Sequence, residues 1–249
     1  MKFQIFLYSG SKLLSVREIE RYLKERLKKN VEDRGEFLNH CPKGSAEEFA
    51  KTLARIRIID VMKPFKYNEP LYGEIEYEKR VLKGAVAPGG ILYDGFMLQQ
   101  IFYELLPKEE KNLESVHIIF TDRLLATFDE NDLRYHARVN ILGCPSIISV
   151  SGVVEAPAKP REYYVERQFA GSEELLKLKY KGRFIDYDDE RLTEVVKGCA
   201  MQAVFYQIFG EAFCESKKCR LYNAHWQEEL INAQLKDNFC ERHEKMLRL

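Results

Sequence analysis

The sequence GCAMQAVFYQIFGEAFC occupies residues 198–214, and Cys219, Cys240 and His243 follow it. Its apolar character predicts a buried helix, because a helix that is hydrophobic all round normally lies in a protein core. Gly210 marks the expected end of that helix. The thiols and the imidazole that follow predict a metal site directly behind it.

The spacing of these four side chains is suited to zinc. Four residues separate Cys214 from Cys219, twenty separate Cys219 from Cys240, and two separate Cys240 from His243. Two short chelating pairs joined by a loop of ~15–20 residues are common in structural zinc sites, and four protein ligands leave no position for a reacting water. We therefore expect one structural Zn²⁺ that orders the polar C-terminal segment. The alternatives are a disulfide between Cys214 and Cys219, or isolated cysteines.

Composition limits the other functions. The 249 residues include 39 basic and 39 acidic side chains, so the formal net charge is zero. A neutral chain lacks the electrostatic attraction that drives non-specific binding to nucleic acid, and it gives no support for an anionic membrane as partner. Neither a secretory signal nor an apolar run near the ~20 residues of a membrane span is evident. We expect a soluble, cytoplasmic protein.

Alternating strand and helix patterns predict a mixed α/β (α+β) architecture, with a twisted sheet packed on helices. The expected strands are 2–8, 31–38, 56–61, 116–120, 137–142 and 146–154. The expected helices are 16–29, 45–55, 94–106 and 186–210. Residues 63–90 contain several prolines and glycines, which predict connections and an edge hairpin. The polar segment 163–187 is ambiguous. We expect one compact unit made of a mixed-sheet subdomain, 1–187, and a helix with a small zinc-stapled subdomain, 188–249.

The apolar helix can be compared with the zinc-protease motif, in which two histidines four residues apart hold the metal and a glutamate beside the first acts as base. The metzincin form adds a glycine and then a third histidine. With Gly210 at the glycine position, the ligand positions fall on Ala203, Gln207 and Phe213, and the base position on Val204. Only Gln207 has a lone pair to offer, and an amide oxygen is a weak zinc ligand. The sequence therefore predicts no catalytic residues here.

At these positions the chain resembles the archaemetzincins, zinc-dependent peptidases of the metzincin clan. That family joins its metal-binding helix to a cysteine, places a second cysteine after four residues, and has a Cys-x-x-Cys near its C-terminus. Gly210, Cys214, Cys219 and Cys240 match that pattern, and His243 stands at the fourth cysteine. The resemblance implies a metzincin-like fold and the structural zinc. Peptidase activity does not carry over, because the catalytic ligands are replaced and Leu221 stands where the family has a methionine.

Three functions remain open from the sequence. The first is a catalytically inactive relative, a pseudoenzyme that binds an extended peptide or a protein partner in the family cleft by adding a strand to the sheet edge. The second is an active hydrolase with a rebuilt metal site that uses Gln207, Glu211 and a distant histidine. The third is a zinc-stapled module that binds nucleic acid or a protein partner, against which the neutral charge counts.

Overall fold

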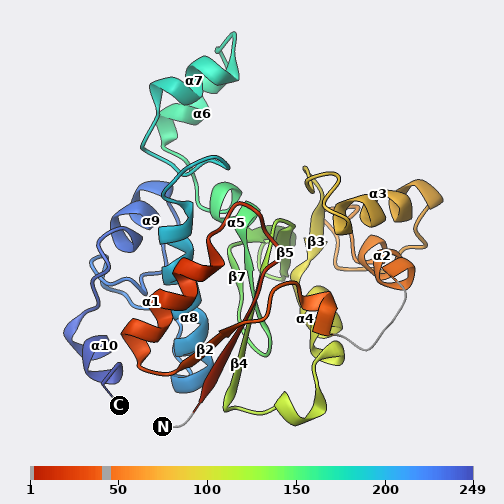
Figure 1. The fold of residues 1–249 in the computed structure, drawn as a ribbon. Coiled ribbons are helices and arrows are strands. Elements are labelled where there is room, and N and C mark those ends of the chain that lie inside the picture. The colour runs from red at the N-terminus through yellow and green to blue at the C-terminus, as the bar shows by residue number, and fades with distance from the viewer. Residues whose placement is uncertain (1–2, 41–45, 249) are drawn as a thin grey trace.

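The computed structural model describes residues 3–40 and 46–248. Its main sheet has five strands in the order β2-β1-β4-β8-β7 (Figure 1). They are β2 (Asn30–Asp33), β1 (Gln4–Tyr8), β4 (Ser115–Thr121), β8 (Ser146–Ser149) and β7 (Asn140–Ile141). The first four are parallel, and β7 runs antiparallel to β8 at the edge.

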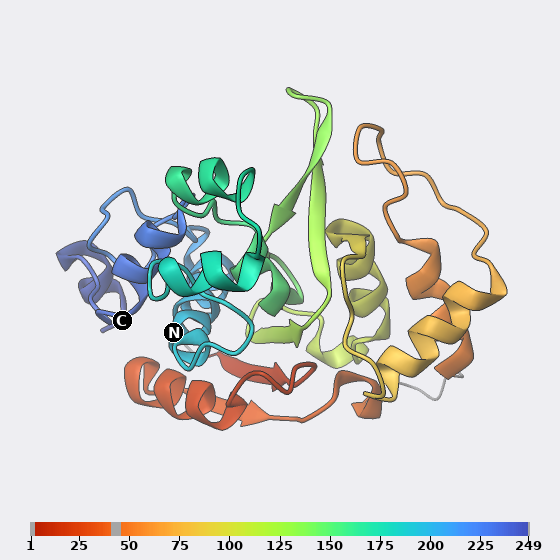
Figure 2. The same ribbon diagram turned by 90° about the horizontal axis from the view of Figure 1, so that it is seen from above.

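A second sheet of three strands, β3-β5-β6, lies beside the first. It consists of β3 (Leu92–Asp94), β5 (Leu124–Asp129) and β6 (Arg134–Arg138). Strands β5 and β6 form an antiparallel hairpin that projects from the body, seen from above in Figure 2. The mixed α/β fold class predicted from the sequence is confirmed.

Ten α-helices surround the sheets in the part of the chain that the structure describes. They are α1 (Val16–Leu27), α2 (Ala46–Arg55), α3 (Tyr72–Leu82), α4 (Gly95–Leu105), α5 (Val150–Glu155), α6 (Arg161–Arg167), α7 (Glu173–Lys179), α8 (Leu192–Phe209), α9 (Gln227–Gln234) and α10 (Glu241–Met246). Two short 3-10 helices cover Phe37–His40 and Lys108–Glu110. Helices α1 and α8 lie side by side on one face of the main sheet, and α4 lies on the other (Figure 1).

The main sheet is buried on both faces because helices pack on each of them, and successive side chains of a strand point to opposite sides. On β1, Ile5 and Leu7 join the cluster that contains α1 and α8, whereas Phe6 and Tyr8 join the cluster that contains α4. The predicted apolar stripe of α1 is buried as expected. The first cluster draws residues from both sides of position 188, and the division into two subdomains stays a prediction.

Three strand predictions were wrong, and a fourth, 137–142, is divided between β6 in the second sheet and β7 in the main sheet. The strand predicted at 31–38 ends at Asp33, because Gly35 at φ +67° turns the chain away. Residues 56–61 form only an isolated bridge, between Arg57 and Tyr93. The strand predicted at 146–154 ends at Ser149, whose hydroxyl accepts a hydrogen bond from the Gly152 N–H at 2.8 Å and so begins α5. A short apolar run does not distinguish a strand from a buried helix.

The helix predictions also needed changes. The predicted edge hairpin within 63–90 is replaced by α3, whose first turn is closed by Glu74 accepting from the Leu71 N–H at 2.7 Å. Helix α8 begins at Leu192 and not at residue 186. Residues 163–187 contain most of α6 and all of α7, and α9 and α10 were not predicted. The predicted start of the second helix, Ser45, lies outside the described residues.

None of the helices in the described part of the chain combines the length and the apolar character that a membrane crossing requires.

Candidate metal centre and the helix without ligands

The structure brings Cys214, Cys219, Cys240 and His243 together, with their ligand atoms all within 4.8 Å of one another. Cys214 follows the end of α8, where Gly210 has φ +73° and closes the helix. Cys219 lies in the next turn. Cys240 precedes α10, and His243 lies in the first turn of that helix. Segments 20 residues apart in the chain thus meet at one point.

The distances match a tetrahedral zinc site. Zn–S bonds of ~2.3 Å place neighbouring sulfurs roughly 3.8 Å apart. The Sγ atoms of Cys214 and Cys240 are 3.9 Å apart. The Nδ1 atom of His243 lies 3.5 Å from the Cys219 sulfur and 3.0 Å from the Cys240 sulfur. The cysteines are free, so the alternative disulfide between Cys214 and Cys219 does not form in this structure. A candidate Cys₃His site is therefore present.

Two members of the cluster are buried, and its sulfurs accept backbone hydrogen bonds. Cys219 and His243 are fully buried, and burial raises the pKa of the Cys219 thiol to about 12. A bound zinc ion supplies the positive charge that keeps such a thiol deprotonated. Backbone N–H groups already point at the sulfurs: Ser216 donates to Cys214 at 3.4 Å and Cys240 donates to Cys219 at 3.5 Å.

The loop that carries Cys219 is fixed to α8 by a buried network that the sequence did not reveal. The fully buried guanidinium of Arg220 pairs with Glu194 on α8 at 2.6 Å and with Asp237. The Gln234 Nε2 donates to the Arg220 carbonyl at 2.9 Å, and the Oε1 of the same amide packs against Gly198. Gly198, a glycine inside an apolar helix, was the one signal of this close approach in the sequence.

The positions of the protease motif have other surroundings. Ala203 and Val204 are fully buried in the core between α8 and the sheet. Gln207 donates from Nε2 to the Ser115 carbonyl at 2.8 Å, and its Oε1 is buried with no hydrogen-bond partner among the described residues. Phe213 is 45% exposed. These four positions provide no set of metal ligands.

A second group of side chains that could bind a metal lies outside α8, on the β5–β6 hairpin. Asp129, Asp132 and His136 lie within 4.8 Å of one another on the β5–β6 hairpin. Asp132 already pairs with Arg134 and His136, each at 2.7 Å. Apart from this group and the Cys₃His cluster, the described residues include no cluster of three or more such side chains.

A hollow of about 480 Å³ lies beside the C-terminal end of α8. Gln207 lines it together with residues of the α4–β4 connection and the β7–β8 loop. The full lining is Tyr103, Lys111, Asn112, Leu113, Gly143, Cys144, Tyr206, Gln207 and Gly210. Glu211, the other residue of the rebuilt-hydrolase hypothesis, is exposed, is not part of this lining, and pairs with Arg242. Burial raises the pKa of the Cys144 thiol, so this thiol is protonated at neutral pH.

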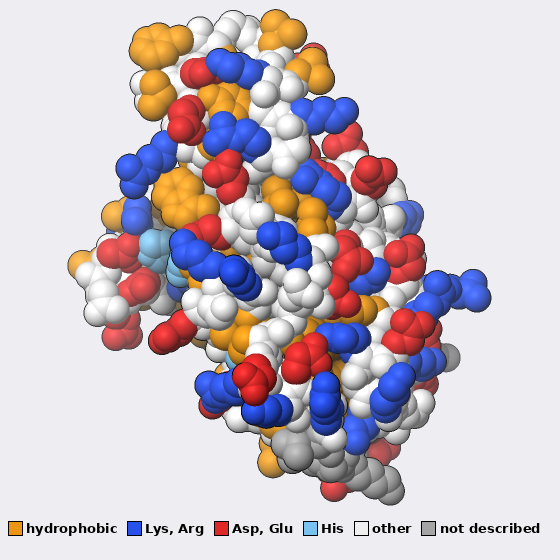
Figure 3. All heavy atoms as spheres, turned by 90° about the vertical axis from the view of Figure 1, so that its left-hand side faces the viewer, with side chains coloured by type: hydrophobic (Ala, Val, Ile, Leu, Met, Phe, Trp, Pro, Cys, Tyr) orange, Lys and Arg blue, Asp and Glu red, His pale blue; other side chains and the backbone are white. Residues whose placement is uncertain are grey.

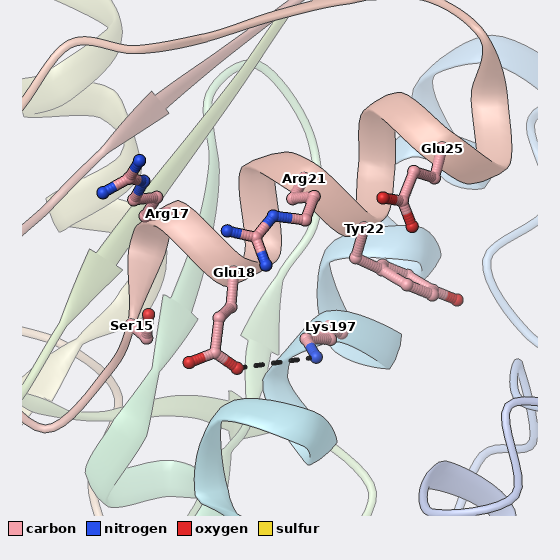
Figure 4. Close-up of a pocket in the computed structure, with 7 residues that line it drawn as sticks. All are labelled: Ser15, Arg17, Glu18, Arg21, Tyr22, Glu25 and Lys197. Carbon is pink, nitrogen blue, oxygen red and sulfur yellow. Dashed lines mark ion pairs between the residues drawn. The ribbon is translucent and has the colours of Figure 1, made fainter.

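A smaller hollow of about 390 Å³ lies between α1 and α8 (Figure 4). Its lining is charged or polar except for the Tyr22 ring, and Glu18 points toward Lys197 with an ion pair of 3.8 Å. The exposed cations Arg17 and Arg21 lie along the same side of α1. It contains no thiol or imidazole, and it is separate from the metal centre.

These features define a class of protein: a mixed α/β protein with a candidate Cys₃His metal site directly after a buried apolar helix. The profile described as "Probable metallopeptidase family (DUF6775)" matches residues 1–249, and the chain belongs to that family. This membership confirms the relationship to metallopeptidases that the sequence predicted.

Two solved structures are similar to the chain. One is an archaemetzincin from Methanopyrus kandleri, with a TM-score of 0.48 and 13% identity over 99% of this chain and 94% of that chain. The other is a zinc-dependent peptidase from Methanocorpusculum labreanum, with a TM-score of 0.44 and 14% identity over 98% of this chain and 99% of that chain. No curated protein matches the sequence.

Proposed function

We propose that this chain is a metallopeptidase homologue that has lost peptidase activity, binds one structural zinc ion, and uses the hollow beside Gln207 to bind an extended peptide. One observation carries the proposal. The four thiol and imidazole ligands converge behind α8, while the positions on α8 that a catalytic metal would need hold Ala203, Gln207 and Phe213. A reducing compartment, the cytoplasm, suits a centre built on free thiols.

The zinc ion has a structural role in this proposal. Three thiolates and one imidazole complete a tetrahedron, so no open position is left for water or substrate. The ion would join the turn after α8 to the start of α10 and so order the last 36 residues. Apolar burial in that segment is limited to a few side chains, including Leu221 and Leu230, so a metal is a plausible source of its stability.

Metal analysis tests this part. Purified protein should contain one zinc per chain, and Cys240→Ser should lose it. His243→Cys should retain it, because a thiolate can replace the imidazole. Cys144→Ser is the matched control, since Cys144 is a free cysteine outside the cluster. Two metal ions per chain would contradict the proposal and favour the rebuilt hydrolase.

Peptide binding is supported by the surroundings of the hollow. Its rim exposes Tyr103, Tyr206 and Leu113, the last 78% exposed. The Lys111 ammonium lies 4.7 Å from the Tyr103 ring centroid, so a cation stands beside the apolar rim. Aromatic rims with a few polar groups are typical of ligand sites.

The nearby edge of the main sheet offers few backbone groups that could pair with an added strand. Strand β7 has only two residues, and Gln99 donates to the Leu142 carbonyl at 3.1 Å directly after it. Strand addition would therefore be confined to Asn140 and Ile141, and we propose that side-chain contacts with the rim carry most of the recognition.

Screening a peptide library by fluorescence anisotropy tests the binding. Leu113→Asp and Tyr206→Asp should weaken binding of any peptide found, whereas Leu71→Asp, at an exposed residue that does not line the hollow, should not. Cleavage of library peptides that Gln207→Ala abolishes would instead establish a hydrolase. We expect no binding to RNA or DNA because the net charge is zero, and a gel-shift titration at low salt checks this.

A further inference from the structure

The hollow beside the C-terminal end of α8 is lined by one charged side chain, the ammonium of Lys111, and by no carboxylate among the described residues. The Cys144 thiol also lines it, and burial raises the pKa of that thiol. The positive charge of Lys111 acts on the same thiol and lowers its pKa by a smaller amount, so the two groups lie near each other. Because a protonated thiol carries no charge, the lining leaves the positive charge of Lys111 unbalanced.

Two contacts with α4 hold the Lys111 ammonium at the rim of the hollow. Its Nζ donates to the carbonyl of Glu104 at 3.2 Å and lies 4.7 Å from the centroid of the Tyr103 ring. An ammonium has three N–H donors, so two of them are left for a ligand. Since protein contacts already restrict the side chain, less conformational freedom is lost when the ammonium pairs with a ligand.

The carboxylates near Lys111 in sequence do not neutralise it. Glu110 pairs with Arg34 at 2.8 Å. Glu109 and Glu114 are exposed, and within the described part of the chain neither forms an ion pair with Lys111. Figure 3 shows a different arrangement, because on the face that it draws basic and acidic side chains are interspersed. The hollow is therefore complementary in charge to an anionic ligand.

The surroundings of this cation are apolar. Tyr103 and Tyr206 are each 42% exposed, and Leu113 is 78% exposed. A ligand that combines one carboxylate with apolar neighbours would satisfy both the ammonium and the rim. The ammonium stands at the rim, where the side chain of a peptide that passes the hollow can reach it.

We propose that the hollow selects extended peptides in which an Asp or Glu side chain is flanked by apolar residues. The carboxylate pairs with the Lys111 ammonium, and the flanking side chains pack on Tyr103, Tyr206 and Leu113. This inference rests on the proposed peptide-binding role of the hollow and adds the class of peptide that it takes. Peptides with a basic residue at the same position are disfavoured, because like charges would then meet at Lys111.

Fluorescence anisotropy of the full-length, zinc-loaded chain with four pools of fluorescein-labelled pentapeptides tests the inference. The central residue is Glu or Gln, the C-terminus is free or amidated, and the other positions are drawn from Ala, Leu, Phe and Ser. The Glu pools should bind about 5-fold more tightly than the Gln pools, as expected for one ion pair at a partly exposed site. The difference should shrink at high salt, which screens the pair.

Variants of the protein identify the lysine that is responsible. With Lys111→Gln the Glu and Gln pools should bind equally, and with Lys111→Glu the Gln pools should bind more tightly. Lys108→Gln is the matched control, because it removes the same charge from an exposed residue that does not line the hollow. It should keep the 5-fold preference. Unchanged circular dichroism and zinc content show that each variant is folded.

The pools also separate this inference from the proposed function. If the wild type binds all four pools equally, peptide binding stands and the preference for acidic peptides is overturned. A preference for the free C-terminus without one for Glu would assign Lys111 to a chain end and overturns it as well, as does a preference for Glu that Lys111→Gln leaves intact. If no pool and no library peptide binds, the proposed peptide-binding role fails, and this inference fails with it.

Discussion

Replacing Gly198 by alanine separates what helix propensity predicts from what the packing of this protein predicts. Gly198 lies inside α8, where alanine normally stabilises a helix by about 1 kcal/mol relative to glycine. In this structure a Cβ at position 198 would overlap the Oε1 of Gln234 and lie 3.1 Å from the Nε of Arg220. Both of those side chains are fully buried and have little room to move.

The expected loss follows from two effects. Extra volume in a packed core costs about 1–3 kcal/mol. A displaced Gln234 amide would also give up its 2.9 Å bond to the Arg220 carbonyl, and a buried carbonyl without a partner costs about 1–3 kcal/mol. After the propensity gain is subtracted, the free energy of unfolding should fall by about 3 kcal/mol. For a chain of this size that is a decrease in Tm of roughly 8 °C.

Urea denaturation of the zinc-loaded protein, followed by circular dichroism, measures this change. Gly73→Ala in α3 is the matched control, because a Cβ there meets no atom within 4 Å. That variant should gain up to ~1 kcal/mol. In a Gln234→Ala background, Gly198→Ala should become stabilising because the overlap is gone. If Gly198→Ala alone is as stable as the wild type, the close approach of α9 to α8 is wrong.

Further outcomes are expected from the metal, the buried histidine and α8. Chelation of zinc at neutral pH should unfold α9 and α10, with a stability loss on the order of 10 kcal/mol, while hydrogen exchange in the main sheet stays slow. Burial lowers the pKa of His117 from 6.5 to about 4, so stability should fall by about 3 kcal/mol as pH drops from 6.5 to 4. His117→Gln should remove that part of the pH dependence of the free energy of unfolding. If urea titrations show the same decrease between pH 6.5 and 4 in this variant, the prediction is wrong. Peptide turnover should not exceed the uncatalysed rate, and Gln207→Ala should leave it unchanged in a mass-spectrometric assay.

The candidate metal site and the C-terminal end of α8 differ in the metal ligands that each can offer. Cys214, Cys219, Cys240 and His243 bring four candidate ligand atoms within 4.8 Å of one another. The hollow next to α8 is open, but its Gln207 amide is held by a backbone carbonyl of β4. A catalytic ion at that hollow would need at least two further ligands, and its lining provides no histidine or carboxylate.

Local signals in the sequence identified the features that depend on neighbours in the chain. The apolar stripe of α1, the long apolar run of α8 and its end at Gly210 follow from helical periodicity and glycine conformation. The ligand set of Cys214, Cys219, Cys240 and His243 followed from spacing. The prediction that Ala203 and Phe213 are not zinc ligands also needed no structure, because alanine and phenylalanine cannot bind zinc in any conformation.

Tertiary contacts determined the features that local signals leave ambiguous. Residues 146–154 are mostly apolar, and the Ser149 bond to Gly152 marks the change from β8 to α5. Residues 56–61 have strand-like composition, yet they meet β3 only at the isolated bridge between Arg57 and Tyr93, while the Arg57 side chain pairs with Glu78 on α3.

The sequence by itself thus determined which side chains could hold a metal and which could not, because that depends on the chemistry of each residue. Only the tertiary structure decided that the four ligands meet, that Arg220 and Gln234 fix them to α8, and that Lys111 and Gln207 line one hollow. These outcomes depend on how segments far apart in the chain pack against each other, and ligand spacing alone predicted only the first of them.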